Sequence, residues 1–251
     1  MTNAEKYNFA DFTRCNYRNL IRLAKNHWEF RDYSQFDNTS RQVIWRHDVD
    51  YSPHCALKLA EIEAQEGVSS TFFILPHSEY YNLLELEVSE IFRKIHAMGH
   101  KLGIHLDAYY YGIEDISSMI EPLSWEKMLI ERAIGIGCVV DSFSFHTPNE
   151  FLLSCVDLQY GGLFNAYAQR FRGEVGYCSD SNGYWRHRRL EDVLMAGDDY
   201  SLQVLTHPEW WQDAVMSPLE RVERCCNSRC QKNKDRYQRL LNEWKRPNID
   251  W

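Results

Sequence analysis

The stretch Arg46-His47-Asp48-Val49-Asp50 decides the fold, because it ends the apolar run Val43–Trp45 and leads directly into Tyr51-Ser52-Pro53. A β-strand turns residues i and i+2 to the same face, so Asp48 and Asp50 are expected to project together where a strand ends. Two carboxylates at one strand end suit a metal ion or a proton transfer. A structural alternative is that Asp50 or Ser52 caps a helix that begins at the next proline.

The composition predicts one globular domain covering residues 1–251, with 44% apolar and 25% charged residues. No segment approaches the roughly 20 apolar residues of a membrane helix, and the polar first residues do not resemble a signal peptide. We therefore expect no membrane insertion and a cytoplasmic protein. A net charge of −8 argues against a nucleic-acid partner. The eight scattered cysteines are expected to be reduced thiols.

Helical and strand-like segments alternate along the chain. Apolar spacing and end signals predict helices at about 9–28 (within an N-terminal helical extension at about 1–30), 53–65, 84–98, 125–135, 190–196 and 218–245, with a short helix from 149. Strands are expected at 70–75, 101–105, 141–145 and 202–206, besides the one that contains Val43–Trp45. The periodicity is lost between 161 and 189, which predicts a long functional loop. This alternation is typical of a parallel sheet covered on both faces or closed into a barrel.

Sites in such folds gather at the C-terminal ends of the strands. The residues His105, Asp107, His146 and His207 end other predicted strands. A divalent cation such as zinc binds imidazole nitrogen and carboxylate oxygen, so Asp50, His105 and one further group would make a metal site. Asp48 would then take a proton from water and His207 would protonate a leaving amine, which together predict hydrolysis of an amide or ester.

Each of these residues also has a structural interpretation. His105 and His207 can be hydrogen-bonded core histidines, and His146 can serve only to fix a turn. The aromatic residues Tyr109, Trp185, Trp210 and Trp211 lie next to the predicted site segments and would offer flat platforms for a sugar ring, unless they fill the core instead.

The motifs resemble those of the polysaccharide deacetylase superfamily, known as the NodB-homology or carbohydrate esterase family 4 fold. Arg46–Asp50 resembles the first motif, which implies that Asp48 is the base and Asp50 a metal ligand. Gly99–His105 resembles the approach to the first metal-binding histidine, and Leu205–His207 resembles the motif of the catalytic acid. Phe145–Pro148 falls where a third motif stands. The resemblance implies an α/β fold, namely a distorted (β/α) barrel of seven strands, and a divalent metal, with zinc the expected ion.

Two departures from the family's pattern bear on the prediction. The second metal histidine of the family falls four residues after the first, where this chain has Tyr109. The third ligand is then His146, which stands in place of an arginine, or Asp107. Typical members act outside the membrane on polymers, whereas this chain shows no export signal, so its expected substrate is a cytoplasmic precursor.

Three functions follow from these observations. The first is a metal-dependent amide hydrolase that removes an acetyl-like N-acyl group from a small or nucleotide-linked sugar precursor in surface polysaccharide biosynthesis. The second is hydrolysis of a cyclic amide or ureide. The third is a non-catalytic sugar-binding protein, which the tyrosine at position 109 would favour. The sequence predicts no particular oligomeric state.

Overall fold

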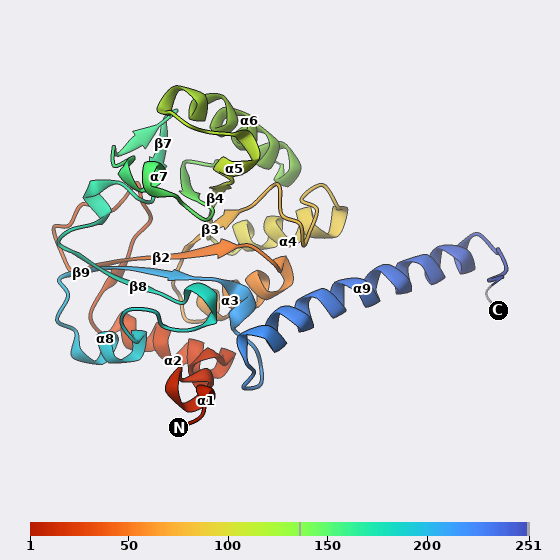
Figure 1. Ribbon diagram of the computed structural model, residues 1–251, viewed down its shortest axis with the longest axis horizontal. Coiled ribbons are helices and arrows are strands. Elements are labelled where there is room, and N and C mark those ends of the chain that lie inside the picture. The colour runs from red at the N-terminus through yellow and green to blue at the C-terminus, as the bar shows by residue number, and fades with distance from the viewer. Residues whose placement is uncertain (136, 250–251) are drawn as a thin grey trace.

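An open, curled sheet forms the centre of the computed structural model, which describes residues 1–135 and 137–249 (Figure 1). The strand order is β6-β7-β5-β4-β3-β2-β9-β8, and β1 pairs with β2 beside this path. Every pairing is parallel except that of β6 with β7. The bounds are β1 Glu29–Phe30, β2 Gln42–Val49, β3 Thr71–Ile74, β4 Lys101–Leu106, β5 Ser142–Phe145, β6 Gln159–Tyr160, β7 Leu163–Asn165, β8 Val175–Ser179 and β9 Ser201–Thr206.

The distorted α/β barrel is confirmed, although the described residues form nine strands rather than the seven expected. Two of the nine strands, β1 and β6, are only two residues long. The predicted loop at 161–189 contains β7 and β8, so this expectation was wrong in part. The burial of β8 is irregular, with exposed and half-buried positions between its buried ends, and therefore gives no clear strand period.

The described part of the chain has nine α-helices, most of which pack around the sheet while α9 extends away from it (Figure 1). Their bounds are α1 Asn3–Lys6, α2 Arg14–Lys25, α3 Pro53–Gln65, α4 Leu86–Ala97, α5 Ala108–Tyr111, α6 Ile116–Ile134, α7 Glu150–Ser154, α8 Leu190–Ala196 and α9 Pro218–Glu243. The predicted bounds of α3 and α8 are confirmed. The helix expected from residue 9 begins at Arg14, where Thr13 caps it, and α6 begins at Ile116 rather than at 125 because Asp115 caps it there.

The side chains of β2 alternate between the outer face of the sheet and the interior of the barrel. Val43 and Trp45 pack outward with α2 and α8, whereas Ile44 packs inward with Phe73 and its neighbours. Continuing this period places Asp48 on the inner face and His47 on the outer one. The sequence therefore delivers its carboxylates to the interior of the barrel.

The outward His47 is a structural residue, which agrees with the expectation that it turns away from Asp48. Its Nε2 lies 2.8 Å from Glu63 Oε1 of α3, and its Nδ1 lies 2.6 Å from Thr206 Oγ1 of β9. Glu63 also accepts hydrogen bonds from the hydroxyl groups of Tyr17 and Ser70. This buried network fixes α2 and α3 against the sheet.

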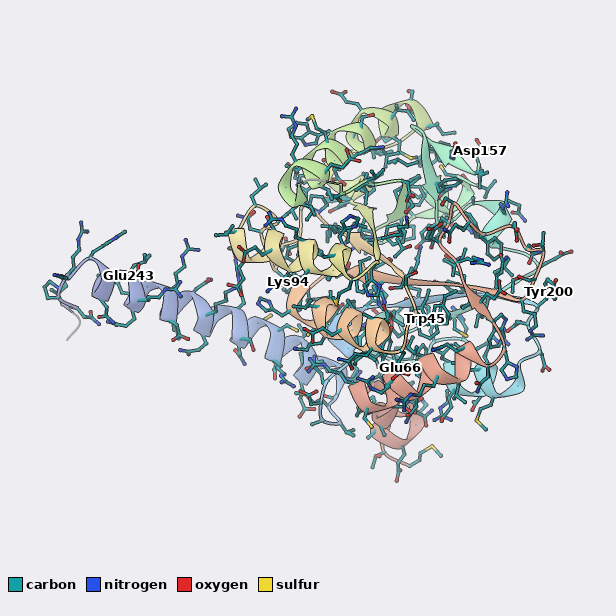
Figure 2. All side chains as sticks on the ribbon, turned by 180° about the vertical axis from the view of Figure 1, so that it is seen from behind. Trp45, Glu66, Lys94, Asp157, Tyr200 and Glu243 are labelled. Atoms are coloured by element: carbon teal, nitrogen blue, oxygen red, sulfur yellow. The ribbon has the colours of Figure 1, made fainter. Side chains whose placement is uncertain are left out.

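Helix α9 leaves the body of the molecule along its own direction, with Glu243 far from the sheet (Figures 1 and 2). Its first half is tied to the N-terminal end of α4 by ion pairs of Arg229 with the capping residue Glu85 and of Lys232 with Glu87 of the first turn. Of its residues, only Arg221 is buried. Among the described residues, no helix combines the length and the apolar character needed to cross a membrane.

Candidate active site

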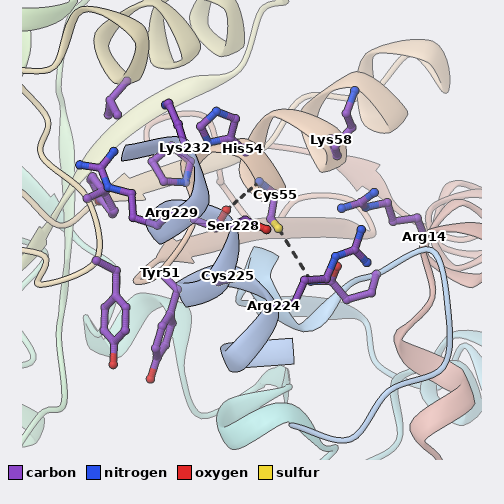
Figure 3. Close-up of a pocket in the computed structure, with 16 residues that line it drawn as sticks. Arg14, Tyr51, His54, Cys55, Lys58, Arg224, Cys225, Ser228, Arg229 and Lys232 are labelled. Carbon is purple, nitrogen blue, oxygen red and sulfur yellow. Dashed lines mark hydrogen bonds between the residues drawn. The ribbon is translucent and has the colours of Figure 1, made fainter. Parts of the chain in front are cut away.

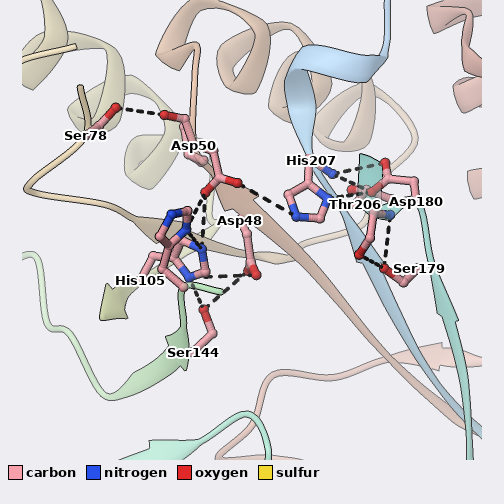
Figure 4. A network of polar contacts seen from close by, with 12 residues as sticks. Asp48, Asp50, Ser78, His105, Ser144, Ser179, Asp180, Thr206 and His207 are labelled. Carbon is pink, nitrogen blue, oxygen red and sulfur yellow. Dashed lines mark hydrogen bonds and ion pairs between the residues drawn. The ribbon is translucent and has the colours of Figure 1, made fainter. Parts of the chain in front are cut away.

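A cavity of about 900 Å³ opens at the C-terminal ends of the central strands. Five of the residues predicted for the site line it and come from four strands or the turns that follow them: Asp48, Asp50, His105, His146 and His207. Asp48 lies within β2 and Asp50 just beyond its end, while His146 and His207 follow β5 and β9. These five side chains therefore lie at one edge of the sheet, where Figure 4 shows Asp48, Asp50, His105 and His207.

Three donor atoms form a small triangle at the centre of this group. Asp50 Oδ1 lies 3.2 Å from His105 Nε2 and 3.5 Å from His146 Nδ1, and the two nitrogens are 3.1 Å apart. Ligands held at about 2.1 Å from one ion in tetrahedral or octahedral geometry are spaced about 3.0–3.4 Å apart. The triangle has the size that a divalent cation requires.

One carboxylate oxygen of Asp50 has no hydrogen-bond donor among the described residues. Its Oδ1 is buried and makes no hydrogen bond of acceptable geometry. Although burial opposes ionisation, the contacts with His105 and His146 hold the pKa of Asp50 well below its usual range. A negative oxygen facing two imidazole nitrogens fits a cation, so the residues present suit the expected metal.

Ser144 and Asp48 fix the orientation of His105. The Nδ1 atom of His105 lies 2.7 Å from Ser144 Oγ, whose hydroxyl donates to Asp48 Oδ1 at 3.4 Å. This contact leaves Nε2 of the ring directed at the triangle. A hydrogen bond on the far nitrogen is the usual way in which a metal-binding histidine is oriented.

Arg46 supplies the cation that faces Asp48. Its Nη2 lies 3.4 Å from Asp48 Oδ2, and both side chains are buried. The guanidinium also lies over the ring of Tyr167, 5.0 Å from its centroid. Sequence reasoning gave Arg46 no role, although it precedes Asp48 by two residues and so shares its face of the strand.

Asp180 fixes the position of His207 by contacting both its imidazole ring and its backbone N–H. Its carboxylate lies 2.6 Å from His207 Nδ1, accepts the backbone N–H of His207 at 3.0 Å and accepts Trp211 Nε1 at 3.1 Å (Figure 4). Burial works against the charged imidazolium, but the Asp180 carboxylate outweighs it and raises the pKa of His207 to about 10. Sequence reasoning missed Asp180 because the strand it follows, β8, was taken for loop.

The turn after His146 carries backbone strain. Thr147 has a φ of 42°, a left-handed conformation that a β-branched residue rarely adopts. The residue lines the cavity. Strain of this kind persists where the surrounding structure holds a functional side chain in place.

Three of the four aromatic residues expected to bind sugar do not line the cavity. Tyr109 is 94% exposed on α5, and Trp211 is fully buried against Tyr17. Trp185 stacks on Phe12 and donates to Asp11. Those two tryptophan expectations were wrong because packing in the core outweighs proximity in sequence. Trp210 does line the cavity.

Asp107, the alternative third ligand, points elsewhere. Its Oδ1 accepts the backbone N–H groups of Tyr109 and Tyr110 and so caps α5. The strand does not continue past Leu106, so residue 107 does not share the face of His105. Of the two alternatives, the structure brings His146 to the triangle.

Comparison with known proteins bears on the fold. The sequence matches no family model, and no curated protein matches it. Among solved structures, a Streptococcus mutans CE4 esterase is similar over 85% of this chain and 90% of its own, with 15% identity and a TM-score of 0.51. A family 4 carbohydrate esterase from Streptomyces lividans in complex with acetate (16% identity, 77% and 90% covered, TM-score 0.43) is also similar. The chitin deacetylase of the fungal pathogen Colletotrichum lindemuthianum is similar as well, with 15% identity, 76% of this chain and 83% of its own chain covered, and a TM-score of 0.44.

Proposed function

We propose that this chain, which has the fold of the Streptococcus mutans CE4 esterase, is a metal-dependent hydrolase that removes an acetyl-like N-acyl group from a sugar. The observation that carries the proposal is the triangle of Asp50, His105 and His146 with Asp48 on one side and His207 on the other. Asp48 Oδ2 lies 3.7 Å from His105 Nδ1, and His207 Nε2 lies 4.0 Å from Asp50 Oδ2. A base and an acid therefore flank one metal-sized centre.

The roles of the side chains follow from their positions. Asp50, His105 and His146 would hold the ion, which when bound supplies a Lewis acid that polarises the amide carbonyl and the attacking water. Asp48 takes the proton of that water, while Arg46 holds its carboxylate in place. His207, fixed by Asp180, delivers a proton to the amine nitrogen as the C–N bond breaks.

The rest of the cavity supports a small anionic substrate. Arg172, Arg186 and His187 line it together with aromatic rings, and the described residues offer these three side chains no carboxylate partner. Arg172 lies over Tyr167, which fixes its direction. A nucleotide-linked sugar would place its phosphates on these cations and its sugar against Trp210. The proposed substrate is thus a nucleotide-linked, N-acylated sugar precursor in the cytoplasm, destined for a surface polysaccharide.

Replacing the base tests the proposal. Purified protein loaded with zinc, cobalt or manganese should release acetate from a panel of nucleotide-linked N-acetyl sugars. Asp48→Asn should lower kcat by about 10²–10⁴ and leave the metal content unchanged. Asp107→Asn is the matched control, because the amide oxygen still caps α5 and turnover should stay within about twofold of wild type.

Other outcomes would overturn the proposal. A wild-type protein that takes up no divalent ion at any tested pH would contradict the metal site. A protein that binds metal and sugar without turnover, with Asp48→Asn and His207→Ala changing affinity alone, would be a sugar-binding protein. Turnover of cyclic amides or ureides instead of acylated sugars would assign it to that other class of hydrolase.

A further inference from the structure

A second cavity, of about 290 Å³, lies between the first turn of α3 and the first half of α9 (Figure 3). Its lining residues include six basic side chains and no carboxylate: Arg14, His54, Lys58, Arg224, Arg229 and Lys232. Two thiols, Cys55 and Cys225, also line it. Nothing in the proposed hydrolysis uses this cavity.

Cys55 lies where a thiolate is stabilised. It is the third residue of α3, close to the positive end of the helix dipole. Cys225 lines the same cavity, and Gln212 Nε2 donates a hydrogen bond to the Cys55 sulfur at 3.8 Å. The neighbouring Cys225 thiol is the main cause that lowers the pKa of Cys55 to about 6, against the opposing effect of burial and with smaller contributions from Ser52, Arg14 and Gln212; the same interaction raises the pKa of Cys225.

Five of the six basic side chains that line the cavity are paired with carboxylates. On the rim, Arg14 pairs with Asp213, Lys58 with Glu61, Arg229 with Glu85, and Lys232 and His54 with Glu87. Arg224 has no ion pair with any described residue. These carboxylates do not line the cavity, and the buried Glu209 acts on Cys225, where it contributes to the raised pKa of that thiol. Cys55 is only 8% exposed, which leaves the cavity as its route to a small reagent.

We propose that Cys55 and Cys225 form a redox-active thiol pair, in which Cys55 attacks an oxidant and Cys225 resolves the product. With hydrogen peroxide as the oxidant, the Cys55 thiolate attacks one oxygen and the O–O bond breaks. Hydroxide leaves and takes up a proton to become water, and Cys55 becomes a sulfenic acid. The Cys225 sulfur then loses its proton and attacks the Cys55 sulfur, whose S–O bond breaks to release a second water. The two thiols lose two electrons and two protons, and the peroxide is reduced.

The disulfide would join the first turn of α3 to the part of α9 that lies against the body. Tyr51, just before α3, lines both this cavity and the candidate active site. The cross-link would therefore form against the wall of the active-site cavity. It closes a long loop, which predicts a higher Tm for the oxidised than for the reduced protein.

Limited peroxide treatment of the full chain followed by non-reducing peptide mapping tests the pairing. We expect a disulfide between the peptides of Cys55 and Cys225, reversed by a dithiol reductant. Cys226→Ser is the matched control, because Cys226 is the exposed neighbour and its loss should leave the disulfide intact. Cys225→Ser should form none and should instead accumulate a sulfenic acid at Cys55 that dimedone traps.

The reactivity of Cys55 supplies a second measurement, taken on Cys225→Ser with a neutral aromatic disulfide as the probe near pH 6. Cys55 has the larger thiolate fraction, and the weaker nucleophilicity of that thiolate offsets this advantage only in part. We therefore expect Cys55 to react with the disulfide about tenfold faster than the exposed Cys15 does. Cys225→Ala removes the donor and should slow Cys55. The proposal fails if Cys55 reacts no faster than Cys15, or if peroxide links other cysteines as readily in the wild-type chain.

Discussion

Glu126 is a buried carboxyl group without a hydrogen bond. It lies on α6 with 0% exposure, and neither oxygen makes a hydrogen bond of acceptable geometry. Burial raises its pKa to about 8 against the opposing effect of the Tyr111 hydroxyl, and His77 Nε2 lies 3.4 Å from its Oε1. The folded protein therefore keeps a proton that the unfolded chain releases, so stability from this group falls as the pH rises from about 4.5 to about 8.

Glu126→Gln keeps the shape and removes the ionisation. We expect the variant to gain stability over wild type as the pH rises through this range, by an amount on the order of a few kcal/mol at about pH 9. Urea unfolding at several pH values measures the difference. Glu121→Gln, an exposed change on the same helix, should follow the wild-type profile. Parallel profiles for wild type and Glu126→Gln would contradict the prediction.

At the scale of single residues, the sequence identified the groups that approach the metal-sized centre but not those that hold them. Asp48, Asp50, His105 and His207 end local patterns that can be recognised in the chain. Arg46, Ser144 and Asp180 act through partners on the same or another strand. A polar residue next to a site carries no signal of its own until the strands are paired.

At the scale of elements, the close packing of β4 against its neighbouring strands leaves no room for a side chain at Gly103. A Cβ at this position of β4 would lie 2.4 Å from two ring atoms of Phe73 and 2.9 Å from the Ser142 carbonyl oxygen. Gly103→Ala should therefore cost about 1–3 kcal/mol of unfolding free energy. In a Phe73→Leu background, where the ring is absent, the same change should cost less. Denaturant unfolding of the four proteins gives the coupling, and additive costs would show that the ring is not the obstacle.

The outer half of α9 contributes little to the fold. No side chain from 233 to 243 is buried. A chain that ends after Asn233 should keep its Tm within about 1–2 °C, because exposed side chains contribute little to stability. Differential scanning calorimetry and light scattering check this. A large fall in Tm, or a change in mass from oligomer to monomer, would show that this half packs against a second copy.

At the scale of the whole molecule, the proposed metal site would join the ends of three strands, β2, β4 and β5. An ion that binds only the folded state stabilises it by about 2.7 kcal/mol at a hundredfold excess over its Kd. Zinc titration should therefore raise the Tm of wild type, and a chelator should reverse the shift. His146→Ala should abolish most of the shift, whereas Asp48→Asn should retain it. An equal shift in wild type and His146→Ala would remove His146 from the site.

The sequence by itself determined the elements whose signals are local. Helix α3 is set by Ser52 and Pro53 at its start and by Gly67 after its end, and the inward direction of Asp48 and Asp50 follows from strand alternation. Only the tertiary structure decided between His146 and Asp107, brought Asp180 to His207 and placed Trp211 in the core. These outcomes depend on which strands pair and where each strand ends. Such contacts join residues far apart in the chain, and no local period reports them.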